Sequence, residues 1–287
     1  MGITVIYENA NGQTVEFSKK AGIRLVQIDG LSSNDIDVSS AQSTGQIGAS
    51  LTGQKVQPKS VTFEGRYRYD PTIRRKILDT ILPTVSARIR YIDDQAGIDV
   101  YLEGVPTQTP DMSTNPYWQS FQFTMFCAFP YWKAIDGGYL NFVSYEARFK
   151  FPYTFSSTEQ WKISEKVINQ LSTIINSGSV PIGFVARFMA KDTVVGPELL
   201  KVVTQEVLKF SSLTMQINDE LVISTIPNDC YCYLIRDGEE INAFPDMDFD
   251  ASFFQLDVGE NPLRFDADSG LDSLELDIEY AITYAGV

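Results

Sequence analysis

The sequence predicts a mainly β protein with two domains. Apolar and polar residues alternate along several stretches, as expected for strands that bury one face. Turn signals separate these stretches, and the Asp-Gly pair at 237–238 is typical of a hairpin. A length of 287 residues allows one large domain or two of ordinary size. With 44% hydrophobic residues, the chain can bury a substantial core.

Strand patterns occur in both halves of the chain. The apolar positions of the three clearest ones are Val61, Phe63, Tyr67 and Tyr69; Phe121, Phe123, Met125, Cys127 and Phe129; and Leu274, Leu276, Ile278, Tyr280, Ile282 and Tyr284. Each pattern directs one face toward a core and the other toward solvent. Short strands punctuated in this way predict a sandwich or a barrel.

One helix is predicted, over residues 71–82. Asp70 is a suitable N-cap, and Pro71 suits the first helical position. Isoleucines then recur at every fourth position, and Pro83 ends the helix. Residues 163–175 have the same spacing, but their β-branched end fits a strand equally well, so helix and strand both stay open there.

Residues 31–60 form a different kind of segment. They are rich in Ser, Gly and Gln, and they show little amphipathic pattern. This composition predicts a long loop, which we expect to be functional or ordered by a partner. A domain boundary is expected between 133 and 140, so we place the first domain at 1–137 and the second at 138–287.

Charge and composition exclude several kinds of function. Lys and Arg number 23 and Asp and Glu 37, giving a net charge of −14, which is unsuited to clamping a nucleic-acid backbone. The chain has no histidine, which excludes Ser-His-Asp and Cys-His catalysis and His-ligated metal sites. Residues 236–280 contain 14 acidic and 2 basic residues, a net charge of −12 that we expect on a solvated sheet face.

The remaining candidate sites are incomplete. Cys230 and Cys232 lack further metal ligands, and Cys127 is remote in sequence. The run Asp246-x-Asp248-x-Asp250 resembles the opening of a calcium loop, but Ala251 stands where the sharp turn needs glycine. The segment 48–55 resembles a phosphate-binding loop without its helix. We therefore predict no catalytic, cofactor-binding or metal-binding residues, no cofactor and no enzymatic activity.

No membrane insertion is expected. The first residues, MGITVIYENANG, lack the basic start and apolar stretch of a signal peptide. No apolar run approaches the roughly 20 residues that span a bilayer.

The first half resembles the first domain of phage distal tail proteins, the hub proteins of siphophage-type tail tips and baseplates. The resemblance rests on Glu64-Gly65-Arg66-Tyr67-Arg68 followed by a short helix, on Pro116-Tyr117-Trp118, and on the run FQFTMFCAFPYWKA. In that family the aromatic strand closes on a Pro-aromatic-Trp signature, which here is Pro130-Tyr131-Trp132.

The second half resembles the second domain of the same family. Ile175-Asn176-Ser177-Gly178 with Pro181 resembles the entry to that domain, and LVISTIPNDCYCYLIRDGEEIN resembles its paired strands. The run 253–261 resembles its F-x-x-L-x-x-G-x-N hairpin, and the last strand ends Ile282-Thr283-Tyr284.

The resemblance implies a structural virion protein at the tail tip, assembled in the host cytoplasm. In that family, a β-barrel-like domain with one helix builds a hexameric ring, and a galectin-like β-sandwich points outward. The tail tube lies above the ring and tail-associated, receptor-binding or baseplate proteins lie below, while DNA passes through without specific binding. The loop at 31–60 is expected to act as the belt that contacts a neighbouring subunit. The alternative function is a saccharide-binding adhesion module of a tail or cell surface.

Overall fold

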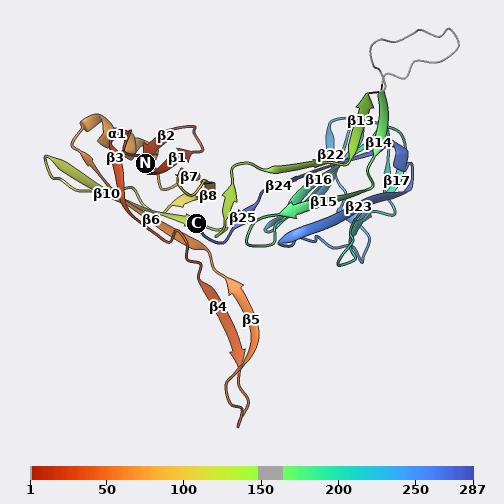
Figure 1. The fold of residues 1–287 in the computed structure, drawn as a ribbon, viewed down its shortest axis with the longest axis horizontal. Coiled ribbons are helices and arrows are strands. Elements are labelled where there is room, and N and C mark those ends of the chain that lie inside the picture. Colours follow the sequence, from red (N-terminus) through yellow and green to blue (C-terminus); the bar gives the residue numbers. More distant parts are fainter. Residues whose placement is uncertain (1, 148–163) are drawn as a thin grey trace, which may run out of the picture. The chain divides into compact units, whose positions relative to one another are not determined.

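The computed structural model describes residues 2–147 and 164–287, and its regular secondary structure consists mainly of strands (Figure 1). The chain divides into two compact units. Unit 1 comprises Met1–Ile135 with Thr283–Val287, and unit 2 comprises Asp136–Ile282. The prediction of a mainly β protein is confirmed.

Unit 1 contains a large antiparallel sheet with the strand order β2-β1-β7-β8-β10-β6-β3. Three short strands, β9, β11 and β25, pair at its margins. The bounds are β1 (Ile3–Asn9), β2 (Thr14–Phe17), β3 (Ile23–Asp29), β6 (Lys59–Arg68), β7 (Ala87–Asp93), β8 (Ile98–Pro106), β9 (Asp111–Met112), β10 (Trp118–Cys127), β11 (Trp132–Ala134) and β25 (Thr283–Tyr284).

The sheet of unit 1 is rolled around one core. Phe17 on β2 stacks on Phe121 of β10, with 5.4 Å between ring centroids. Tyr7 on β1 meets Phe123 of β10 edge-on at 5.9 Å. These strands are not neighbours in the sheet, so their side chains can meet only because the sheet curls. The rolled shape agrees with the barrel-like domain expected from the sequence.

The helix α1 runs over Pro71–Thr80. The Asp70 carboxylate accepts a hydrogen bond from the backbone N–H of Thr72 at 2.8 Å, which makes it the predicted N-cap. Ile77 and Ile81 are fully buried in the core of unit 1. The helix ends two residues earlier than predicted because the backbone of Ile81 is already extended, although its N–H still donates to the carbonyl of Ile77.

Residues 31–60 do not form an irregular loop, so that prediction is wrong. β4 (Ile36–Ala41) and β5 (Ser50–Val56) pair as an antiparallel hairpin, and β6 begins at Lys59. The hairpin leaves the sheet of unit 1 as a two-stranded ribbon (Figure 1). Alternation was undetectable in the sequence because nearly every residue of both strands is exposed, so no face needs to be apolar.

Unit 2 is a β-sandwich of two antiparallel sheets. One has six strands in the order β12-β24-β16-β20-β21-β22, and the other has the order β15-β23-β17-β18, with β19 beside β17. The bounds are β12 (Gly138–Asn141), β15 (Leu171–Asn176), β16 (Phe184–Ala190), β17 (Val194–Lys201), β18 (Glu206–Lys209), β19 (Thr214–Met215), β20 (Glu220–Ile226), β21 (Asp229–Arg236), β22 (Glu239–Asn242), β23 (Gly259–Ser269) and β24 (Leu274–Tyr280).

Short elements complete unit 2. β13 (Val143–Ala147) pairs with β14 (Ser164–Ile168). The 3-10 turn η1 (Phe244–Asp246) follows β22, and η2 (Leu271–Ser273) connects β23 to β24. In the ambiguous stretch 163–175, residues 164–168 lie in β14 and residues 171–175 lie in β15, so its described part contains strands and no helix. Asp237 and Gly238 both have positive φ, and they connect β21 to β22 as the predicted hairpin turn.

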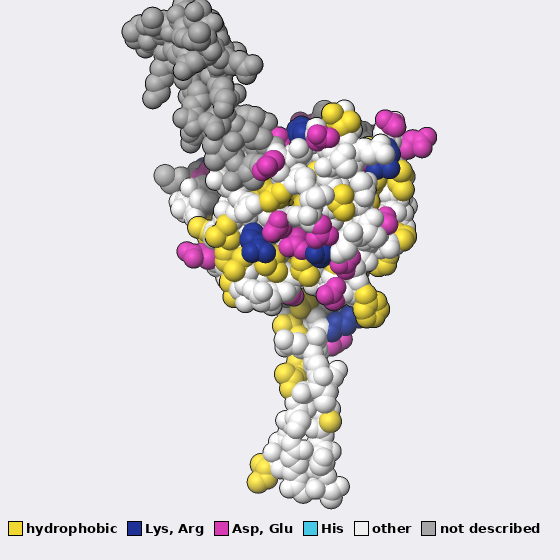
Figure 2. Space-filling view, turned by 90° about the vertical axis from the view of Figure 1, so that its right-hand side faces the viewer, with side chains coloured by type: hydrophobic (Ala, Val, Ile, Leu, Met, Phe, Trp, Pro, Cys, Tyr) yellow, Lys and Arg dark blue, Asp and Glu magenta, His cyan; other side chains and the backbone are white. Residues whose placement is uncertain are grey.

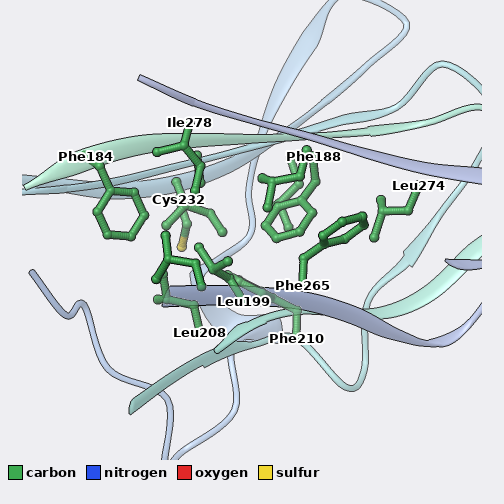
Figure 3. Close-up of a cluster of buried hydrophobic side chains, with 14 of the residues drawn as sticks. Phe184, Phe188, Leu199, Leu208, Phe210, Cys232, Phe265, Leu274 and Ile278 are labelled. Carbon is green, nitrogen blue, oxygen red and sulfur yellow. The ribbon is translucent and has the colours of Figure 1, made fainter. Parts of the chain in front are cut away.

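The core of unit 2 lies between its two sheets. Phe184, Phe188 and Ile278 point down from the six-stranded sheet, and Leu199 and Phe265 come from the facing sheet (Figure 3). Alternate residues of β16 are buried, as two-faced packing requires.

The last residues return to unit 1, which corrects the placement of 283–287 in the second domain. The alternating stretch breaks after Tyr280, where β24 ends. Thr283 and Tyr284 then pair with Lys133 and Trp132 of β11. Sequence alternation continues across the break because both segments bury one face, but the two faces lie in different units.

Candidate functional site

The hairpin of β4 and β5 is the clearest candidate for a functional surface. Its two strands pair with each other and with no other strand of the described chain. An isolated two-stranded hairpin is at best marginally stable in water. A ribbon of this kind is therefore expected to be held by a second surface.

The hairpin is uncharged for most of its length and carries exposed apolar side chains. Asp37 and Lys55 are the charged residues between 36 and 56, and they lie directly opposite each other. Ile36, Val38 and Val56 share one face by the strand register, and Val38 is 62% exposed. Figure 2 shows the ribbon as mostly uncharged, with hydrophobic side chains along it. We call Ile36, Val38 and Val56 the apolar stripe.

The base of the hairpin is fastened to unit 1. The carbonyl of Leu31 accepts hydrogen bonds from Trp132 Nε1 at 2.8 Å and from Lys59 Nζ at 3.1 Å. Asn34 Nδ2 donates to the carbonyl of Ala285, which ties the hairpin base to the C-terminal residues. Gly30 has a φ of +83°, and a Cβ there would lie 2.4 Å from the carbonyl oxygen of Ser60, so only glycine fits.

Two titratable groups under the hairpin base are buried. Lys59 lies opposite Cys127 on β10, and burial lowers the pKa of its ammonium group. Burial raises the pKa of the Cys127 thiol to about 12, so this cysteine is a neutral core residue near pH 7. The carbonyl of Leu31 accepts a hydrogen bond from the Lys59 ammonium, which offsets part of the cost of burying that charge.

Sequence reasoning missed Lys59, although a signal was present. Lys59 lies two and four positions before Val61 and Phe63, so its side chain is on the same inward face of β6 as theirs. A charged residue at an inward position indicates a specific partner, because an unpaired buried charge is costly. Nothing in the sequence indicated that the partner is the carbonyl of Leu31.

The residues of the calcium-like run have separate partners. The carboxylate of Asp248 accepts bonds from the N–H and hydroxyl of Ser211, and these bonds lower its pKa. Asp257, at the twelfth position counted from Asp246, where a calcium loop has its last ligand, pairs with Lys201 Nζ at 2.6 Å. Across residues 2–147 and 164–287, no group of three or more Cys, Asp or Glu side chains is arranged to hold a metal ion.

The other sequence candidates are also separated. The segment 48–55 lies at the tip and second strand of the hairpin. Cys230 is exposed, whereas Cys232 is buried in the core of unit 2. Within the described ranges, no helix is long and apolar enough to cross a membrane.

Solved structures of phage proteins match this chain over nearly its whole length, including both units. The Dit protein of phage SPP1, described as a paradigm of the hub adsorption apparatus of phages that infect Gram-positive bacteria, matches with a TM-score of 0.65. The match covers 99% of each chain at 12% identity. The chain has the fold of phage distal tail proteins. A protein of the phage P2 baseplate, in its activated conformation with Ca, matches with a TM-score of 0.50 at 14% identity, over 97% of this chain and 98% of the other.

No protein-family model and no curated protein matches the sequence. The likeness in fold is accompanied by only 12–14% sequence identity.

The two units of this distal tail fold differ in charge. Counted over the sequence, unit 1 contains 13 basic and 13 acidic residues, and unit 2 contains 10 basic and 24 acidic residues. Unit 1 therefore has no net charge, and unit 2 carries the whole −14.

Proposed function

We propose that this protein is a structural component of a phage tail tip, where six copies form a hub ring that joins the tail tube to baseplate and host-adhesion proteins. The observation that supports this role best is the end-to-end fold match to the SPP1 hub protein, which includes both units. The role is one of assembly and requires no catalysis. The protein would reside in the virion after assembly in the host cytoplasm.

Unit 1 is proposed as the ring-forming, tail-tube-like domain, and unit 2 as a galectin-like sandwich that faces outward. A closed ring needs heterologous contacts, in which one surface of a subunit meets a different surface of the next. The apolar stripe of the hairpin supplies one such surface, since it is exposed in the single chain. In the ring, the hairpin acts as a belt against the neighbouring subunit.

The proposed partners are the tail tube protein on one side of the ring and tail-associated or receptor-binding proteins on the other. DNA would pass through without specific binding. The equal numbers of basic and acidic residues in unit 1 support this, because tight backbone binding needs an excess of Lys and Arg.

The mass of the purified protein in solution tests the proposal. Light scattering over a range of concentration and salt should give six times the 32.2 kDa of the chain, or twice that for paired rings. If the protein is a monomer at every concentration, addition of the cognate tail tube complex should recruit six copies. A monomer that such a complex does not recruit would contradict the hub role.

A further inference from the structure

Three arginines lie together on the outer face of the sheet in unit 1. Alternate residues of β6 are buried, so Arg66 and Arg68 point outward from that strand. Arg24 of β3 lies directly opposite Arg66, and on the other side of β6 Ser120 of β10 lies opposite Arg66 and Trp118 opposite Arg68. The three strands are neighbours in the sheet (Figure 1). We call Arg24, Arg66 and Arg68 the arginine patch.

The arginine patch has no stabilising partner. Within residues 2–147 and 164–287, no member of the patch makes an ion pair or a side-chain hydrogen bond, whereas Arg75, Arg88 and Arg90 of the same unit each pair with a carboxylate. Arg24 and Arg66 are cross-strand neighbours with about 5 Å between their Cβ atoms, and like charges in that arrangement are destabilising. An anionic ligand would relieve this repulsion.

The surroundings of the patch are polar. Ser120 is exposed and lies in the same row as two of the arginines. On the side away from Trp118, the next outward row contains Glu64 and Asp111, so the positive charge is confined to a narrow band. Trp118 lies beside Arg68 at the other side of the band and is 57% exposed.

The chemistry of the patch suits phosphate groups. Arginine and serine side chains are common donors to the phosphates of nucleic acids, and a guanidinium can donate two parallel hydrogen bonds to one phosphate. Residues two apart on a strand are separated by about 6.6 Å, so the three side chains can each reach a different phosphate of one backbone. An acidic protein partner is disfavoured because the band has no apolar centre, which protein–protein contacts usually have.

We propose that the arginine patch binds the phosphodiester backbone of DNA without sequence preference. Each guanidinium donates to a phosphate, and Trp118 stacks on a base where the strand is unpaired. Three phosphate contacts on a protein with a net charge of −14 give weak binding that salt readily reverses. Weak, reversible contact is compatible with DNA that passes through a hub. That setting rests on the proposed function, whereas the binding itself requires only residues of unit 1.

Fluorescence anisotropy with the full-length protein and labelled DNA tests the patch. The probes are an oligonucleotide of about 20 nucleotides, longer than a typical contact site, as a single strand and as a duplex. In about 50 mM salt we expect a Kd on the order of 10⁻⁵ M. For the duplex, log K should fall with log salt concentration with a slope of about −2.7, or about 0.9 for each of three phosphates. A second, unrelated sequence should bind equally well.

Arg66→Gln should weaken binding to both probes about five-fold and reduce the size of the salt slope by about 0.9. Its melting temperature should stay the same or rise, because a like-charge contact is removed. Trp118→Ala should weaken binding of the single strand alone, by about five-fold or more. Arg264→Gln is the matched control, because it removes an exposed strand arginine of unit 2 that lies near Glu198 and Asp266, and it should leave binding unchanged.

Absence of binding to both probes in about 50 mM salt, the low end of the range in which phosphate contacts are measured, would overturn the proposal. Equal losses from Arg66→Gln and Arg264→Gln would also overturn it. Tighter binding of labelled poly-glutamate than of DNA would show that the patch prefers an acidic protein chain. A protein that forms rings but does not bind DNA contradicts this inference alone. A monomer that binds DNA, and that a tail tube complex does not recruit, contradicts only the hub role.

Discussion

Unit 1 and unit 2 bury similar types of side chain but differ in net charge and in the apolar side chains that they expose. Unit 1 has no net charge and extends a ribbon with exposed apolar side chains, whereas unit 2 carries the whole net charge of −14. A surface without net charge promotes association, and a strongly charged one resists it. For the proposed ring, we therefore expect self-association through unit 1, with charge repulsion between the second units of neighbouring copies.

The largest expected effect comes from Trp132→Ala. Trp132 is fully buried, packs near Tyr91 and donates to the carbonyl of Leu31 at the hairpin base. Its removal should lower the free energy of unfolding by about 3–5 kcal/mol. Hydrogen–deuterium exchange should increase across unit 1 and at the hairpin base. Trp118→Ala, which removes a largely exposed indole, should cost less than about 0.5 kcal/mol. An equal increase of exchange in unit 2 would show that the units do not unfold separately.

Unit 2 has its own buried ion pair. The Asp219 carboxylate is buried and accepts from Arg236 Nε at 3.0 Å and from the N–H of Gln216 at 2.7 Å. Burial opposes ionisation of Asp219, but these bonds outweigh it and lower its pKa. Arg236→Met should destabilise unit 2 by about 3 kcal/mol, measured by chemical denaturation, because it leaves an uncompensated buried charge.

The exposed pair Arg75–Asp79 provides the matched control for Arg236→Met. Arg75→Met should change stability by less than about 0.5 kcal/mol. Similar losses for the two variants would mean that burial of Asp219 has little energetic consequence.

The apolar stripe is expected to matter for assembly and not for folding. Val38→Asp places a charge on the stripe and should weaken ring formation about ten-fold or more, or about 1.4 kcal/mol, with no change in thermal unfolding of the single chain. Light scattering measures the ring. Val203→Asp makes the same change at a similarly exposed valine of unit 2 and should leave assembly intact. If both variants form rings equally well, the hairpin is not part of the interface between subunits.

The smallest effect is a pH dependence in unit 1. The pKa of Cys127 is raised from 9.0 to about 12 by burial, so above pH 9 the unfolded chain loses a proton that the folded chain keeps. Stability is complete below pH 9 and is lost as pH rises from 9 toward 12, by about 1 kcal/mol at pH 9.5 from this group.

Cys127→Ala should therefore reduce the loss of stability between pH 8 and 9.5, whatever its effect at pH 7, and denaturation curves at each pH measure this. Cys230→Ala removes an exposed thiol and serves as the control. An unchanged slope in Cys127→Ala would show that this thiol ionises as readily in the folded protein as in the unfolded chain.

Much of the fold could be read from local patterns. The strands around 61–69 and 121–127, the helix after Asp70 and the turn at Asp237-Gly238 each follow from short-range rules of alternation, capping and turn geometry. The hairpin β4–β5 could not be recognised in this way, because a strand exposed on both faces leaves no alternating pattern.

The sequence by itself determined the mainly β character, the single helix, the absence of histidine chemistry and the acidic second half. These features depend on composition and on residues close together in the chain. The tertiary structure decided which distant residues meet, such as Lys59 and Trp132 at Leu31 and Tyr284 beside Trp132. It also decided the register of the six-stranded sheet in unit 2, which places Tyr139, Arg187 and Tyr233 on one face. The physical reason is that strand order and register are set by packing across the whole sheet, and a local pattern specifies a face without specifying its neighbours.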